Sequence, residues 1–428
     1  MKVKFLSILL MLSILMTLTS CTAIQSVDSV NAIKSDLQFK QITLNAFDPD
    51  VQYITASNKL GYNWLRLSDL NKNQLLSPLS LSIALAMLQN GSDLDTRDGI
   101  LTAMNLSNHS ETEINEAYNA LMASLSTKYS DSESTALKVY IANSFWLRED
   151  IEPKQNFIDT LKQTYDADVF RADFANSLTV DLMNKWIEDH TEGLLKDTMK
   201  ELSAEAVAYL MNTVYFKGSW LTPFSANATI EHSFSRLDGQ RVSVPMMQKT
   251  SFFDYFEGED VQIAIFPYYD GMQMKVILPK GDLDSWLQKH DSDAINTLLA
   301  NSNYNRARLQ VLMPKFEYFV NNVLNDFLIS NGMSQAFDET NANFKPMIEL
   351  ATDNVYISRI FQNCKVINDE KGTEAAAVTV VEIEATSAMP DPALPIPFEC
   401  DRPFLYIIED TETQTALFTG VVADPSAD

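Results

Sequence analysis

The chain has 428 residues, of which 46% are hydrophobic, so it contains enough apolar material for one large buried core. Its formal net charge of −25 at pH 7 argues against nucleic acid or an anionic membrane surface as a partner. Glycine is scarce at 12 residues, and we find no internal repeat and no linker-like tract in the middle of the chain. We therefore expect a single domain over residues 45–425.

The first 20 residues predict an export signal. Lys2 and Lys4 give a basic start, and residues 5–18 are almost wholly apolar. This apolar run is shorter than the roughly 18–20 residues that cross a membrane. We expect a signal peptide over residues 1–20 and hence an exported protein.

The signal ends in Leu18-Thr19-Ser20-Cys21, which resembles the lipobox of bacterial lipoproteins. In that motif the cysteine thiol carries the lipid, so the resemblance implies lipidation at Cys21 and contact with a membrane through the lipid. A polar stretch over residues 21–44 is expected to act as a tether. The resulting location is either a membrane-anchored lipoprotein or the extracellular space or periplasm. An ordinary cleaved signal with an incidental cysteine is the alternative.

Beyond the tether, hydrophobic periodicity predicts helices over 45–130 and much of 150–210, most clearly at residues 82–88. Strand-like runs occur between and after these helices. They cover residues 137–146, 208–216, 262–278, 308–313 and 405–408. This mixture of elements predicts an α+β domain.

The segment after Gly372 has strand periodicity. Alternate positions from Thr373 to Ile383 are small or apolar, whereas the other alternate set carries the carboxylates of Glu374, Glu382 and Glu384. Four prolines between residues 390 and 397 follow at once, as in an exposed loop. The pattern indicates a loop over about residues 372–397 that can become a strand.

We find no motif that would make the chain an enzyme. Its four histidines occur in no metalloprotease motif, and no serine elbow or phosphate-binding glycine loop is present. No paired Cys-x-x-Cys indicates zinc, so neither a metal nor another cofactor is expected. Cys364 and Cys400 have apolar or strand-like neighbours and are predicted to be free buried thiols, with a disulfide between them as the alternative.

Ten short motifs, in order along roughly residues 45–425, resemble those of the serpins. The motifs occupy residues 77–80, 142–146, 184–187, 190–193, 212–220, 247–248, 312–316, 370–377, 398–404 and 418–420. The resemblance implies the serpin fold, with three β-sheets, eight or nine helices, and an exposed reactive-centre loop. It also implies a monomer whose fold is metastable as long as the reactive-centre loop is not inserted into the main sheet.

The resemblance further implies a suicide-type protease inhibitor that forms a covalent complex with its target. The family's scissile residue lies fourteen positions after the hinge glycine, which gives the bond Thr386–Ser387 within a window from Ala385 to Met389. The stretch from that bond to Phe398 is two or three residues longer than in the family. The small residues of the window suit elastase-like proteases, with other serine proteases or cysteine proteases as further targets. A non-inhibitory binding or chaperone-like serpin is the alternative function.

Supporting roles are carried over from the family by position. The hinge comprises Glu370, Gly372, Thr373, Glu374, Ala375, Ala376 and Ala377. The breach, at the top of the opening sheet, comprises Lys315, as partner of Glu370, and Trp220 beneath the hinge. The shutter, halfway down, comprises Ser77, Ser80, Asn212 and Gln362, and Gln362 stands where the family usually has a histidine.

Overall fold

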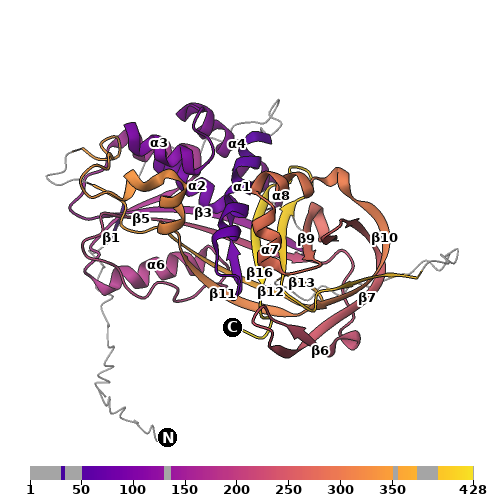
Figure 1. The fold of residues 1–428 in the computed structure, drawn as a ribbon. Helices are drawn as coiled ribbons and strands as arrows, with labels where there is room; N and C mark the ends of the chain where they lie inside the picture. Colours follow the sequence, from indigo (N-terminus) through magenta and orange to yellow (C-terminus); the bar gives the residue numbers. More distant parts are fainter. Residues whose placement is uncertain (1–29, 34–50, 130–135, 350–354, 374–393, 428) are drawn as a thin grey trace, which may run out of the picture.

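The computed structural model describes residues 30–33, 51–129, 136–349, 355–373 and 394–427. In these residues, helices surround and cover a framework of strands (Figure 1). The α-helices of the described part number nine, within the expected eight or nine. They are α1 (Val51–Leu67), α2 (Pro78–Gln89), α3 (Leu94–Ala103), α4 (Glu111–Tyr129), α5 (Gln155–Tyr165), α6 (Ser177–Asp189), α7 (Leu283–Lys289), α8 (Ser292–Leu298) and α9 (Asn325–Leu328).

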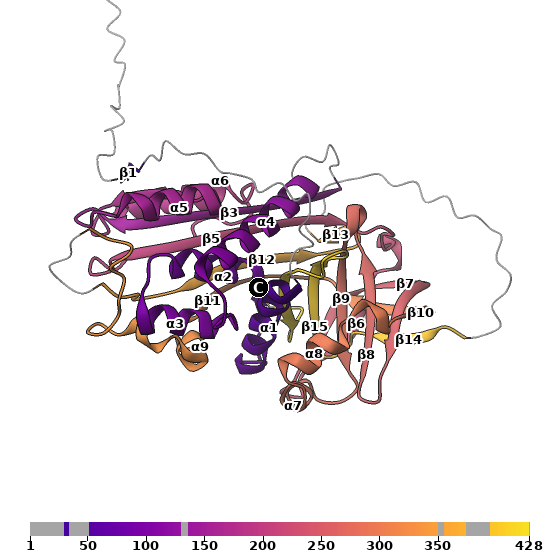
Figure 2. The ribbon, with the colours of Figure 1, turned by 90° about the horizontal axis from the view of Figure 1, so that it is seen from above.

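A sheet of seven strands lies between two layers of helices. Its strands, in spatial order, are β1 (Val30–Ala32), β4 (Asp168–Ala172), β3 (Leu137–Arg148), β5 (Ala208–Ser219), β13 (Gly372–Thr373), β12 (Phe361–Asn368) and β11 (Phe316–Val323). Figure 1 shows α6 below the strands β3 and β5 and α2 above them, and Figure 2 shows the strands of this sheet side by side. We call the side that carries α6 the outward face and the side that carries α2 the inward face.

The remaining strands form a second hydrogen-bonded network. They are β14 (Ile396–Glu399), β10 (Asn305–Pro314), β7 (Arg241–Glu257), β8 (Val261–Pro267), β9 (Met272–Pro279), β15 (Phe404–Asp410), β16 (Ala416–Val422) and β2 (Gln74–Leu76), with β6 (Ile230–Ser235) beside β7. The long strand β7 pairs first with β6 and later with β8. The second and third of the three expected sheets are therefore continuous through β7.

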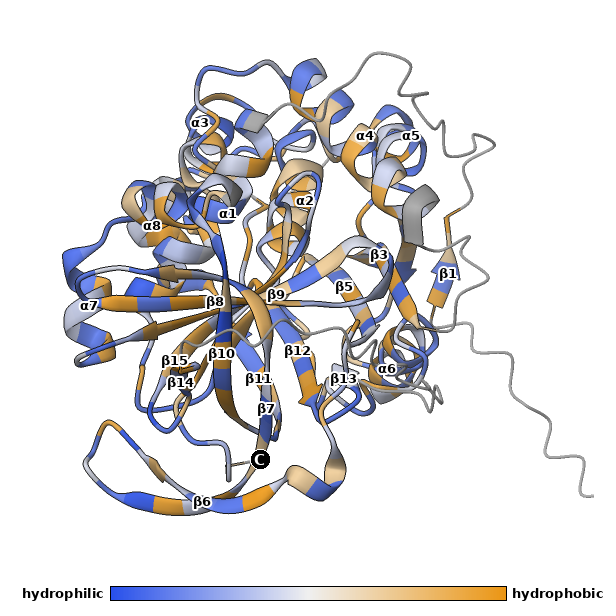
Figure 3. Cartoon of the chain, turned by 90° about the vertical axis from the view of Figure 1, so that its right-hand side faces the viewer, coloured by the Kyte–Doolittle hydropathy of each residue, from blue (hydrophilic) through white to orange (hydrophobic). Residues whose placement is uncertain are grey.

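The core lies where the second network packs under the helices. Every residue of β9, β15 and β16 is buried, and the strands around β8, β9 and β15 are largely hydrophobic in Figure 3. Every residue of α2 is buried as well, including those at 82–88 for which we predicted an amphipathic helix. A helix that is apolar on all sides belongs in the interior, and α2 fills the space between the two sheets.

One predicted strand run is interrupted. The stretch 262–278 forms two strands, β8 and β9, joined by a turn at Tyr269–Gly271 in which Asp270 has a φ of 58°. The sequence carries a signal for this turn, because Asp270-Gly271 between two apolar runs is typical of a β-hairpin, and the prediction of a single run overlooked it. The other four predicted runs fall within β3, β5, β10 and β15.

The N-terminal segment contributes an edge strand. β1 pairs antiparallel with β4, and Ile33 donates its backbone N–H to the carbonyl of Val169 at 2.8 Å. This part of the predicted tether over 21–44 therefore packs on the domain. The predicted signal peptide over 1–20 and Cys21 lie outside the described residues. No helix of the described residues is long and apolar enough to cross a membrane.

Candidate functional site

Two hinge residues, Gly372 and Thr373, already lie in the sheet as the short strand β13. β13 lies between β5 and β12, with Gly372 opposite Ser219 and Thr373 opposite both Gly218 and Asn368. All of these pairings are antiparallel. No ladder joins β5 directly to β12 in the described residues, so β13 alone bridges them at the top. We call the space between β5 and β12 below β13 the slot.

Only glycine fits at position 372. A Cβ on Gly372 would lie 2.1 Å from the carbonyl oxygen of Gly218, far inside van der Waals contact, and that oxygen belongs to rigid backbone. The hinge glycine is therefore required by the close approach of two strands. Thr373, the next residue, is buried with 3% of its surface exposed, and its side chain lies on the inward face.

Thr373 rests on an aromatic platform. Its hydroxyl shares a hydrogen bond of 2.6 Å with the hydroxyl of Tyr268. The Tyr268 ring stacks on Trp220 with centroids 4.3 Å apart and planes 8° apart. Trp220 binds the turn at residues 369–371, directly before β13. Its indole N–H donates to the backbone carbonyl of Asp369 at 3.0 Å, and its backbone N–H donates to the carbonyl of Lys371 at 2.8 Å. Trp220 thus lies beneath the hinge.

Glu370 joins the hinge to two neighbouring elements. Its carboxylate accepts hydrogen bonds from Lys315 at 2.8 Å and from the Thr229 hydroxyl at 2.7 Å. Burial alone would raise the pKa of Glu370, but these hydrogen bonds, together with a backbone hydrogen bond and the charge of Lys315, hold the pKa below its ordinary value. The ionised carboxylate is therefore the form that fastens the turn before the hinge.

Three of the four predicted shutter residues meet. Gln362 accepts from the backbone N–H of Ser77 at 2.7 Å through its amide oxygen, and its amide N–H₂ donates to the Ser77 carbonyl at 3.1 Å and the Ser80 hydroxyl at 3.0 Å. Ser77 also caps α2, accepting from the backbone N–H of Ser80 at 3.3 Å. A neutral amide thus holds β12 against the start of α2, using both its donor and its acceptor.

Asn212 does not join that cluster. Its amide N–H₂ donates to Asn143 on the neighbouring strand β3, and its own Oδ1 is buried without a hydrogen-bond partner in the described part of the chain. The sequence reasoning also missed Tyr268, Thr229 and Asn143 as neighbours of the site. Each is a polar residue in or beside a strand, and its partner lies 69 to 141 residues away, so no local signal marks it.

Several predicted site residues lie outside the described part of the chain. They are hinge residues Glu374, Ala375, Ala376 and Ala377, the bond Thr386–Ser387, and its window from Ala385 to Met389.

Both described cysteines are free and buried, as predicted. Burial raises the pKa of the Cys364 thiol to about 12 and also raises that of Cys400. Neither thiol is therefore ionised near neutral pH, and neither is a ready nucleophile. Among the described residues, no group of three His, Cys, Asp or Glu side chains is placed to hold a metal ion.

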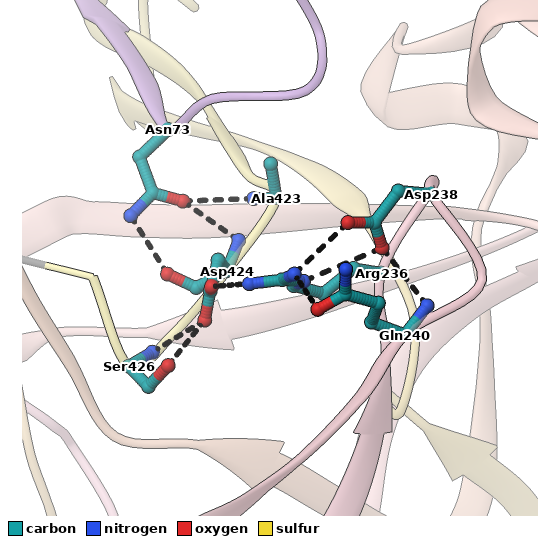
Figure 4. A network of polar contacts seen from close by, with 7 residues as sticks. All are labelled: Asn73, Arg236, Asp238, Gln240, Ala423, Asp424 and Ser426. Atoms are coloured by element: carbon teal, nitrogen blue, oxygen red, sulfur yellow. Dashed lines mark hydrogen bonds and ion pairs between the residues drawn. The ribbon is translucent and has the colours of Figure 1, made fainter.

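The strands that follow the loop are anchored independently of it. β14 pairs with β10, and β15 and β16 lie side by side in the second network. Beyond β16, Asp424 accepts from Arg236 at 2.8 Å and from the Ser426 hydroxyl at 2.6 Å (Figure 4). The side-chain amide oxygen of Asn73 accepts the backbone N–H groups of Ala423 and Asp424. A chain cut in the loop would therefore keep its C-terminal fragment in place.

Comparison with known proteins identifies the class. The family model for serpins, the serine protease inhibitors, matches residues 56–425. Alpha-1-antiproteinase of Rattus norvegicus is 31% identical over 360 residues, covering 83% of this chain and 84% of that protein. The chain therefore belongs to the serpin family, as its motifs predicted, and this is a family of protease inhibitors rather than of enzymes.

Solved structures agree on the fold. The thermophilic serpin tengpin in its native state has a TM-score of 0.83 at 27% identity, covering 92% of this chain and 100% of its own. Tengpin in its latent state scores 0.74 at 26% identity, covering 90% and 100%. Human thyroxine-binding globulin in complex with thyroxine scores 0.77 at 25% identity, covering 88% and 100%.

The Glu370 contacts predict a pH-dependent loss of stability. Because the folded-state pKa is lowered, the stabilisation is present above the ordinary value of 4.5 and is lost as pH falls through the lower folded pKa. We expect Glu370→Gln to cost about 1–3 kcal/mol of stability at neutral pH, the scale of hydrogen bonds to a charged group. The thermal midpoints of variant and parent should converge as pH falls through the lowered folded-state pKa of Glu370.

The matched control is Glu317→Gln, which removes an exposed carboxylate paired with Lys365. This variant should melt close to the parent at every pH, because exposed pairs contribute little. Equal pH profiles for the two variants would contradict a special role for Glu370.

Proposed function

We propose that this serpin is a suicide-type protease inhibitor. A target protease would cut the bond Thr386–Ser387 in the loop that follows the hinge and would remain attached as an acyl-enzyme. It would be trapped when the freed segment, which begins after Thr373, inserts between β5 and β12. The observation that carries this proposal is β13, which is seated at the head of a slot whose two walls are not hydrogen-bonded to each other in the described residues.

The sequence after β13 suits insertion. Ala375, Ala376 and Ala377 would enter first, and small side chains can pass between packed strands without a clash. A new central strand would gain about a dozen backbone hydrogen bonds at a net value of about 1 kcal/mol each. Such a gain is large enough to drive the transition.

The residues around the proposed bond favour a protease with a shallow specificity pocket. Ala385, Thr386, Ser387 and Ala388 are all small, and no Arg or Lys occurs between Thr373 and Cys400. Elastase-like serine proteases accept such residues, whereas trypsin-like proteases require a basic one. A cleavage after Met389 would place Pro390 next to the cut bond, which blocks most serine proteases.

A direct test mixes the mature chain with elastase-like, subtilisin-like and papain-like proteases. We expect a complex that survives denaturing electrophoresis and a C-terminal fragment that begins near Ser387 by mass spectrometry. The cut protein should also melt at a much higher temperature than the uncut protein, because the inserted strand completes the sheet. A cut in an ordinary surface loop would leave the melting temperature unchanged or lower it.

The alternative is a non-inhibitory serpin, which is supported by the likeness to thyroxine-binding globulin, a protein of this fold that is named for binding thyroxine. Loop cleavage without a covalent complex across the whole panel, and without a rise in melting temperature, would favour that alternative.

Thr373 offers a sharper test of insertion. Its side chain is buried against Tyr268, so Thr373→Arg would place a charge in a dry site at the head of the slot. We expect this variant to be cleaved as a substrate, with the protease released active. Thr373→Ser keeps the hydroxyl and is the control that should still trap protease. Equal trapping by both variants would contradict the inward assignment of Thr373.

We also propose that Cys21 carries a lipid and that the mature protein is an exported monomer. We expect the parent, expressed in bacteria, to partition into the detergent phase, and Cys21→Ser to move to the aqueous phase. Cys364→Ser removes a buried thiol and is the matched control. If parent and Cys21→Ser partition alike, the N-terminal signal is an ordinary cleaved one.

A further inference from the structure

Two cations border the slot on its outward face. Lys217 is a half-buried residue near the end of β5, and Arg359 is an exposed residue just before β12. Neither has an ion-pair partner among the described residues, whereas the neighbouring Lys365 on β12 is paired with Glu317 at 2.9 Å. Lys217 also lies directly opposite Lys138 on β3, a like-charge pair that is unfavourable across two strands. Lys138 itself is paired with Glu192 at 2.7 Å.

Arg359 lines a cavity at the lower end of the slot. The cavity has a volume of about 620 Å³, and Tyr209 of β5 and Phe361 of β12 lie on its walls. The Arg359 guanidinium lies 5.7 Å from the centre of the Phe361 ring. Tyr209 packs in the same hydrophobic cluster as Trp186 of α6, which places this cavity on the outward face.

The register of β13 determines where each later residue would go. Thr373 faces Gly218 and Asn368, and the pairings of β5 with β3 and of β12 with β11 contain no bulge. An inserted chain would therefore advance one residue at a time along both walls. The next residue, Glu374, comes opposite Lys217.

Glu382 follows Thr373 by nine residues. In the inserted strand it would therefore lie opposite the residues nine positions before Gly218 and Asn368, which are Tyr209 and Arg359. The wall of β12 remains paired as far as this point, since Leu324 donates to the Ile360 carbonyl at 2.9 Å.

The same register satisfies a buried polar group on the inward face. Thr379 is a polar member of the otherwise small or apolar inward set, and it comes opposite Asn212 and Gln362. Among the described residues the Oδ1 atom of Asn212 is buried without a hydrogen-bond partner, and a threonine hydroxyl can donate to it. The register thus agrees with three separate features of the slot: one orphaned acceptor and two unpaired cations.

We infer that Lys217 and Arg359 are docking residues for this chain's own loop, Lys217 receiving Glu374 and Arg359 receiving Glu382. This inference rests on the proposed inhibitory function. The pairs would favour one register of the inserted strand, because a slip along the slot would separate both carboxylates from their cations.

Charge reversal tests the Arg359 pair. The loop is cut in the parent, in Arg359→Glu, in Glu382→Arg and in the double variant. The midpoint of unfolding in guanidinium chloride is measured for each protein before and after cleavage. Each single reversal should lower the midpoint of the cut form, and the double reversal should restore it. Each single reversal should also raise the number of chains consumed per trapped protease about two- to fivefold, the scale of an exposed ion pair. At high salt these differences should shrink.

The matched control combines Arg359→Glu with Glu374→Arg. In the proposed register Arg359 lies opposite position 382, which is eight residues, or roughly 26 Å at about 3.3 Å per residue, from position 374. The losses of stability caused by these two reversals should therefore be additive. If the reversals of Arg359 and Glu382 also add, the pair does not form, although the proposed function stands. If cleavage does not stabilise the parent, insertion itself does not occur, and both the proposed function and this inference are wrong. Should a reversal prevent folding, Arg359→Gln and Glu382→Gln give the same comparison, with non-additive losses expected.

Discussion

The hydrogen bond between Thr373 and Tyr268 is the contact on which the rest of the site depends. It fixes which alternate residues of the following segment would face the core, because strand side chains alternate strictly between the two faces. A slip of one residue would turn Glu374 and Glu382 inward and bury two carboxylates at a cost of several kcal/mol. The Trp220–Tyr268 stack, which is itself held by the turn before the hinge, supports this contact rigidly.

The top and the middle of the slot are held by different kinds of interaction. At the top, the ionised Glu370 binds Lys315 and Thr229, so this fastening depends on pH. In the middle, the neutral amide of Gln362 binds the start of α2, and an amide does not titrate. A histidine at the Gln362 position would couple strand separation to pH near neutrality. In this chain, acid would therefore loosen the head of the slot before its middle.

Sequence reasoning succeeded where a signal is local or contained in a short motif. Most strand runs could be read directly from the sequence, and the ordered motifs gave the family. It could not find Tyr268 or the isolation of Asn212, because both depend on strands that are distant in the sequence. It also missed the edge strand β1, since three residues of ordinary composition carry no periodic signal. The charge of Arg359 became meaningful only once the register of β13 was known.

The pre-formed strand β13 bears on the rate as well as on the stability of insertion. Strand addition is slow to begin, because chain entropy is lost before the first new contacts repay it. With Thr373 already paired to both walls, that first step is complete before any protease arrives. Under the proposed function, insertion would then proceed by adding one residue at a time, in competition with hydrolysis of the acyl-enzyme. A substitution that weakens the pairing of β13 should therefore make the protein a substrate of the protease rather than an inhibitor, even if the final inserted sheet were equally stable.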